Sequence, residues 1–310
     1  MAETGSIIGR LALLGMGVET TKGTSATVTA AMADTIVYDA EMTPGDLFAD
    51  GERRPNLITG GSIERVKGAQ FGTLTFRTEM IHGDQTEALM SACGWYDNSG
   101  VMTPSEDIDD HKTLTFVLWN PKSKETLIGA AGKFTIESAG TAQRLMISWE
   151  FTGIYVAEVD ASPPAFTPVL SKGYRWHNVT LTMASAAFPP IDGISINSNT
   201  EVQMREDPRT AHGILHYYCV HATPTISFAP EYKPVATYDQ TGLFLAGTAQ
   251  ALAISVADAG GNTFAVAAPK AQRISRGNGD RGSKKLREIE LECHASTGKD
   301  WLTFTLTDAP

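Results

Sequence analysis

Residues 145–151 read Leu145-Met146-Ile147-Ser148-Trp149-Glu150-Phe151, with a large apolar side chain at every second position. Successive side chains of a β-strand point to opposite faces of the sheet, so this alternation predicts a strand with one buried and one polar face. An α-helix would instead repeat its apolar residues every three or four positions. The stretch therefore favours a β fold in which one sheet face is wet.

The same alternation recurs along the chain, between residues that favour turns. The further runs are 73–77, 113–118, 133–137, 178–183, 251–256, 288–293 and 301–306. A short helix is predicted over 84–93, with Asp84 as N-cap and Gly94 as the stop, and a weaker one follows Asp239 and ends at Gly247. The predicted fold class is all-β, with one short helix per domain.

The order of these elements recurs after roughly 130 to 160 residues, which indicates an internal duplication. The first copy comprises 35–41, 72–81, the first helix, 113–118, 134–136 and 145–151. The second comprises 194–202, 224–228, the second helix, 252–256, 264–266 and 289–293. In this alignment Trp149 matches Leu291, and Glu150 matches Glu292. Two unrelated β domains are the open alternative.

The Pro-rich stretch 162–168 cannot donate a regular ladder of hydrogen bonds, so it predicts the boundary between the two copies. The expected organisation is an N-terminal arm over 1–34, a first β domain over 35–161, a linker over 162–173 and a second β domain over 174–310. Each domain is expected to be a β-sandwich or barrel.

Composition excludes several classes of protein. The 310 residues carry a net charge of −10 and no stripe of Lys and Arg, which disfavours tight binding to phosphate backbones. The apolar stretch over 11–18 is far too short to cross a bilayer. The widely spaced Cys93, Cys219 and Cys293 are typical of free buried thiols in a reducing compartment.

Motifs for catalysis and ligand binding are sparse. Residues 277–282 fit G-x-G-x-x-G, but residues 287–294 alternate like a strand rather than a helix, which favours a polar hairpin over a nucleotide site. His212, His216, Cys219 and His221 suggest zinc, yet on a strand the first two would lie about 13 Å apart. We expect no catalytic residues, no metal and no cofactor, and we expect that the chain is not an enzyme.

Several motifs carry a family resemblance. Residues 17–24 resemble the E-T-x-x-G-T opening of phage tail proteins, and residues 149–155 are similar to the F-x-F-x-G-x-Y strand that ends many tail-tube domains. A strand that leads into a helix over 80–94 and a glycine-rich approach to a strand over 129–136 add to it. Together they cover most of 17–165, and the second half matches mainly by element order. The chain resembles the tail-tube, or major tail, proteins of long-tailed, siphovirus-like bacteriophages.

This resemblance implies a structural virion protein that self-assembles into rings stacked as a hollow tail tube, through which DNA passes into the host. A duplicated member resembles tube proteins whose ring closes with three subunits, so that six pseudo-equivalent domains form the inner β-wall. The implied partners are further copies of the chain and the tape-measure and tail-terminator proteins, without specific DNA binding and without a membrane. The implied location is the phage tail, assembled in the bacterial host cytoplasm.

Two sets of residues become candidates for function. The stretch 43–56 is too long for a simple hairpin, and we expect an inter-subunit loop with Asp46, Leu47, Phe48, Arg53 and Arg54. The polar strand positions Glu150 and Thr152, with Glu290 and Glu292 in the second copy, are the candidate lumen face, where carboxylates would repel passing DNA. An outer face that is merely solvated explains them equally well.

The alternative function is a β-sandwich adhesin or carbohydrate-binding surface module. Such modules bind their ligands through exposed aromatic side chains, whereas most Trp residues of this chain fall within strand patterns. The state of assembly of the purified protein would discriminate between the two functions.

Overall fold

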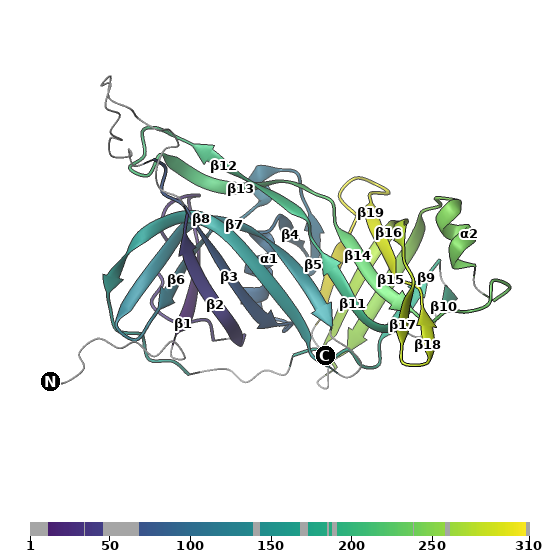
Figure 1. Cartoon of the computed structure of the whole chain (residues 1–310). Coiled ribbons are helices and arrows are strands. Elements are labelled where there is room, and N and C mark those ends of the chain that lie inside the picture. The colour runs from purple at the N-terminus through teal and green to yellow at the C-terminus, as the bar shows by residue number, and fades with distance from the viewer. Residues whose placement is uncertain are drawn as a thin grey trace, which may run out of the picture.

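The computed structural model describes residues 12–33, 35–45, 68–138, 143–167, 173–184, 186–187, 191–237, 239–257 and 261–307. Strands hold 56% and helices 7% of the structure, so the predicted all-β fold is confirmed. Figure 1 shows the first half in purple to teal and the second half in green to yellow, side by side.

Among its described residues, the first half contains eight strands and the longer helix. They are β1 (Leu13–Val18), β2 (Val37–Pro44), β3 (Gly72–Glu79), α1 (Asp84–Ser91), β4 (Trp95–Asn98), β5 (Val101–Pro104), β6 (Leu114–Trp119), β7 (Ser123–Ser138) and β8 (Leu145–Asp160), with a 3-10 turn over Ile108–Asp110. The strand predicted from residues 145–151 is the first part of β8, which buries Ile147, Trp149 and Phe151 as the alternation requires.

The second half continues in the same style. Its elements are β9 (Thr180–Met183), β10 (Ala186–Ala187), β11 (Ile191–Asn197), β12 (Thr200–Glu206), β13 (Ile214–Ala222), β14 (Thr225–Pro230), α2 (Gln240–Leu245), β15 (Gln250–Ala257), β16 (Thr263–Arg276), β17 (Gly279–Arg281), β18 (Lys284–Leu286), β19 (Ile289–His294) and β20 (Thr303–Thr307). All strand pairs between these elements are antiparallel.

The two halves share one order of hydrogen-bonded strands. The first half runs β2-β3-β8-β7, with β6 paired to β7, and the second runs β11-β14-β19-β16, with β15 paired to β16. In each half a helix follows the second strand of this order along the chain: α1 follows β3, and α2 follows β14. This is the order that a duplication predicts, while the proposed domain boundaries remain predictions.

A single sheet passes from one half into the other. The edge of β7 that β8 leaves open pairs with β11, through Glu137 with Ser195, Ile136 with Ile196 and Thr135 with Asn197. A second link pairs β5 with β20. The resulting sheet has 16 strands, and its main path begins at β10 and ends at β2.

Aromatic side chains fill the core behind this sheet. Trp95 meets Phe134 edge-on at 5.1 Å between ring centroids, and Phe134 lies 5.7 Å from Phe304 of the second half. The indole N–H of Trp95 donates to the carbonyl of Leu302 at 3.2 Å. One apolar cluster therefore extends through both halves, because it contains buried residues from β3 to β20.

The hairpin of β12 and β13 reaches back over the first half, as Figure 1 shows above β7 and β8. Its side chains Ile214, Tyr217 and Cys219 pack against Ala131 and Ile154 in a small separate apolar cluster. The second half thus contacts the first half in two further ways: β11 pairs with β7 in the sheet, and the β12–β13 hairpin packs against residues of β7 and β8.

The two helices are capped differently. The helix predicted after Asp239 is α2, and its N-cap is Asp239 itself, whose carboxylate accepts a hydrogen bond from the Gly242 N–H at 2.8 Å. In α1 the N-cap is Gly83 and no side chain caps the helix, so the prediction that Asp84 is the cap is wrong. Asp84 is instead the first helical residue, where its charge favours the helix dipole. Gly94, at a φ of 94°, ends the turn after α1 as expected.

Candidate functional site on the polar sheet face

The polar side chains of the first half stand in rows across the strands, because cross-strand partners project from the same face of a sheet. Glu150 on β8 pairs with Thr75 on β3 and Lys133 on β7, and Thr75 pairs with Glu41 on β2. The ammonium of Lys133 lies 3.1 Å from the Glu150 carboxylate, and both side chains are nearly half exposed. Such a surface ion pair contributes little to stability, about 0 to 1 kcal/mol.

An equivalent row crosses the second half. Glu292 on β19 pairs with Thr225 on β14 and Gln272 on β16, and Thr225 pairs with Asn197 on β11. Each row takes one residue from each of four strands in the same order, with a glutamate on the third strand. Glu150 and Glu292 therefore occupy matching positions, as the sequence alignment predicts.

The β7–β11 ladder joins the two rows into one face. Thr135 and Glu137 point to the same side of β7 as Lys133, and they pair with Asn197 and Ser195 of β11. The polar face therefore runs without a break over eight strands, from β2 to β16. We call it the polar sheet face, and it lies opposite the aromatic core.

The polar sheet face is hollowed in both halves. One hollow of about 440 Å³ lies over β2, β3, β8 and β7 and includes Glu41, Arg77 and Glu150 in its lining. A second, of about 540 Å³, lies over β7, β11, β14 and β19, where Glu137 and Glu290 face it. Concave curvature on the same side of both halves is the shape that an inner wall needs.

Carboxylates outnumber cations among the described strand residues of this face. The carboxylates are Glu41, Glu137, Glu150, Glu290 and Glu292, and the cations are Arg77, Lys133 and Lys270. The excess of negative charge disfavours contact with phosphate groups.

The structure places the four predicted lumen residues on this one face. Glu150 and Glu292 lie in the matching rows, and Glu290 pairs with Ser227 and Ser275 beside the larger hollow. Thr152 pairs with Thr73 and Ala131 at the border of the polar sheet face. Two residues farther along β8, Ile154 is buried under the β12–β13 hairpin. The predicted loop residues Asp46, Leu47, Phe48, Arg53 and Arg54 lie outside the described residues.

Sequence reasoning missed the residues that extend the face between the two glutamate strands, above all Glu137, Ser195 and Asn197. Strand alternation marks each of them as polar and outward. Only the pairing of β7 with β11, which joins residues about 60 positions apart, shows that they connect the two halves.

No family model matches this chain, and no curated protein does. The geometry and the charge of the polar sheet face are therefore the basis for assigning a function.

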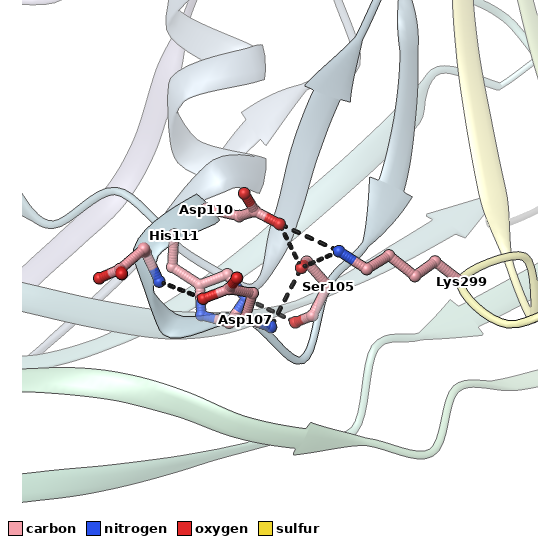
Figure 2. Close-up of polar contacts among 6 residues, drawn as sticks. Ser105, Asp107, Asp110, His111 and Lys299 are labelled. Atoms are coloured by element: carbon pink, nitrogen blue, oxygen red, sulfur yellow. Dashed lines mark hydrogen bonds and ion pairs between the residues drawn. The ribbon is translucent and has the colours of Figure 1, made fainter.

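A polar cluster where the halves meet combines residues that recur in hydrolases (Figure 2). Ser105 donates to the Asp110 carboxylate at 2.6 Å, and Lys299 reaches both, at 3.0 and 3.2 Å. The hydrogen bond to Asp110 raises the pKa of Lys299, and the bonds from Ser105 and Lys299 lower the pKa of Asp110. The lysine is thus held protonated and cannot take a proton from Ser105, so this cluster ties the halves together rather than activating a nucleophile.

The other motifs have structural explanations within the described residues. The glycine-rich run 277–282 forms the approach to and first strand of the β17–β18 hairpin and is followed by β19, which confirms the hairpin interpretation. His216 and Cys219 are both buried in β13, and no group of three metal-ligating side chains was found in the described part of the chain. All three cysteines are free and buried, as expected. Neither described helix has the length and apolar character to cross a membrane.

The motif at residues 19–24 also has a physical basis. The buried Glu19 carboxylate accepts four hydrogen bonds between 2.7 and 2.8 Å, which come from the Gly23 and Gly129 N–H groups and the Thr113 and Thr115 hydroxyls. These donors replace a cation as its partners. Glu19 therefore fastens the segment after β1 to β6 and β7.

Proposed function

We propose that this chain is a structural virion protein that self-assembles into stacked rings and forms a hollow phage tail tube, through which DNA passes into the host. The observation that carries the proposal is the polar sheet face, which is continuous over both halves, concave in each and net acidic. A wall that encloses DNA needs these three properties together, since a basic patch would bind the phosphate groups and retain the nucleic acid.

Recurrence of the strand order supports the ring. Two halves that present equivalent strands in one sheet behave as two adjacent units of a cyclic wall, so three chains would supply six units. Closing such a wall would also pair the edge strands, which otherwise invite aggregation. In this proposal the partners are further copies of the chain, with tape-measure and tail-terminator proteins at the inside and the end of the tube, and the location is the virion.

The rival function is a surface module that binds carbohydrate, and the burial of the tryptophan side chains disfavours it. Four of the five tryptophans, Trp95, Trp119, Trp149 and Trp176, are buried, and Trp301 is half-buried. Sugar recognition needs aromatic faces open to solvent. The core and the strand pairs account for these tryptophans instead.

Negative-stain microscopy of the purified full chain tests the proposal. We expect rings or tubes with a stain-filled channel, and sedimentation velocity should show the same assembly in solution. A protein that stays monomeric over a wide range of concentration and salt, and that binds a glycan, would contradict the proposal and favour the surface module.

The segment around Asp46 to Arg54 gives a second test, because we propose it as the inter-subunit arm. It connects β2 to β3, and the equivalent connection between β11 and β14 contains the β12–β13 hairpin, which packs onto the first half. Deleting 46–54 should leave soluble, folded subunits, measured by circular dichroism, that no longer polymerise. Normal tubes from the deletion variant would show that the arm is dispensable.

A further inference from the structure

The contact between the two halves joins an edge of β7 to an edge of β11. Each half also has a strand edge that is equivalent to one of these and that no described strand pairs with. β7 pairs with β11 through residues 135–137. Ser198 extends this ladder, because its hydroxyl accepts from the Phe134 N–H and its own N–H donates to the Phe134 carbonyl, both at 3.0 Å. β16 takes the place of β7 in the second half, and β2 takes the place of β11 in the first. Among the described residues, no strand pairs with the edge of β2 that faces away from β3. Near Ser275, no described strand pairs with the edge of β16 that faces away from β19.

Apolar side chains are buried in the half whose strand edge is paired and exposed in the half whose equivalent edge is unpaired. In the first half, Leu89 and Met90 of α1 are fully buried, and the second half reaches the end of the helix, where Thr200 donates to the Cys93 carbonyl at 3.1 Å. In the second half, Leu245 of α2 is 77% exposed and Ile274 of β16 is 44% exposed. The apolar side chains beside the open edge of β16 therefore lack the cover that their counterparts beside β7 have.

The ladders also fix the register of the missing contact. Glu41 occupies, in the row of Glu150, the position that Asn197 occupies in the row of Glu292. Thr135 pairs with Ser148, and Ser275 pairs with Glu290 at the matching position of β19. Because Asn197 pairs with Thr135 inside the chain, the equivalent contact between two chains joins Glu41 to Ser275.

We infer that β2 of one copy pairs antiparallel with the C-terminal part of β16 in a second copy, with Glu41 opposite Ser275, and so repeats between chains the β11–β7 contact within each chain. The occupant is a second copy because the contact continues an interface that this chain already makes with itself. This inference rests on the proposed self-assembly and names its seam. The seam is head-to-tail, so successive copies can close a ring.

Disulfide trapping tests the seam. The double variant Glu41→Cys/Ser275→Cys places thiols at two exposed strand positions, whereas the native Cys93, Cys219 and Cys293 are at most 5% exposed and give little background. Mild oxidation should yield covalent dimers and trimers that a reductant dissolves. Neither single variant should yield them, and neither should Glu41→Cys/Glu201→Cys, whose second thiol lies on β12.

A substitution at the uncovered apolar side chain provides an independent readout. Leu245→Glu should leave the circular dichroism and melting temperature of the subunit unchanged, because the side chain faces solvent, yet it should reduce assembly in sedimentation velocity. Val159→Glu, at an exposed apolar position near the end of β8, is the matched control and should assemble normally.

The outcomes separate the seam from the proposed function. If the wild type forms tubes but the Glu41–Ser275 pair does not cross-link, the seam is wrong and the tube stands. Cross-linking by Glu41→Cys alone would mean that β2 pairs with β2, which also overturns the seam. A wild type that remains monomeric without cross-links would overturn both.

Discussion

At the scale of single residues, the Glu19 carboxylate is the clearest example of a buried charge without a cationic partner among the described residues. Backbone N–H groups of Gly23 and Gly129 donate to its two different oxygens. Glu19→Gln would turn an amide NH₂ toward one of these N–H groups in either orientation of the side chain. We expect a loss of about 2 to 3 kcal/mol in the free energy of unfolding, measured by urea denaturation.

Thr113→Val is the comparison for this variant, because it removes only one neutral donor from the same carboxylate. It should cost about 1.5 kcal/mol, the lower end of the range for a hydrogen bond to a charged group. Equal stability of Glu19→Gln and the wild type would show that water or a cation satisfies the carboxylate instead.

His216 makes stability depend on pH. Burial lowers its pKa to about 4, with Arg205 and Lys22 contributing, and neither ring nitrogen has a hydrogen-bond partner within the described part of the chain. The unfolded chain therefore binds more protons than the folded chain between about pH 6.5 and pH 4. The contribution of His216 to stability should fall by on the order of 2 kcal/mol as the pH drops through that range, and this contribution should level off below it.

His216→Phe should remove this part of the pH dependence without loss of stability at pH 7.5, because an apolar ring needs no hydrogen bond. Urea denaturation at several pH values from 7.5 to 4 measures it. His221→Phe, on the same strand but exposed, should keep the wild-type slope. The same slope in the wild type and His216→Phe would assign the dependence to other groups.

At the scale of elements, the two helix caps differ in a way that can be measured. Asp239→Ala removes the side-chain cap of α2 and should cost about 1 kcal/mol in the free energy of unfolding. Asp84→Ala in α1 removes a charge at the first helical residue but no cap, and should cost about 0.3 to 0.5 kcal/mol. A larger loss from Asp84→Ala than from Asp239→Ala would reverse the assignment of the caps.

Elements were predictable where their signal is local. Alternation located the strands around Trp149 and Leu291, and Asp239 and Gly247 bounded α2. His216, Cys219 and His221 were expected on a strand, and β13 confirms this. The pairing of β12 with β13 and the full 16 residues of β7 were not predicted, because bulges interrupt their alternation. The pairing of β7 with β11 could not be predicted at all, since local pattern does not specify which distant edges meet.

The candidate site was predictable to the same extent. The sequence alignment placed Glu150 and Glu292 at matching positions, and the ladders confirm that match. That both lie on one continuous face follows from the β7–β11 pairing, which is a property of the folded chain. The sequence pattern therefore predicted the two matching glutamates, but neither the rows of residues around them nor the connection between the rows.

At the scale of the whole molecule, charge on the polar sheet face can be reversed without touching the core. In the proposed tube, Glu150→Lys with Glu292→Lys would line the channel with cations that bind phosphate. We expect normal tube assembly but slowed or blocked DNA ejection, measured as DNA release from particles built wholly of the variant.

The control reverses two exposed carboxylates away from that face, Glu201→Lys with Glu206→Lys on β12. It changes the net charge equally and should leave DNA release unchanged. Normal release from the Glu150 and Glu292 variant would remove these residues from the channel wall.

The β7–β11 ladder has a kinetic meaning for the proposed assembly. A six-unit ring has six seams, and in a duplicated chain three of them form during folding, at an effective concentration that does not depend on how much protein the cell holds. Of the remaining three, two form by collisions between molecules, and the third closes the ring within the assembled trimer. The onset of ring formation should then follow the third power of subunit concentration at most, where six separate units would approach the sixth.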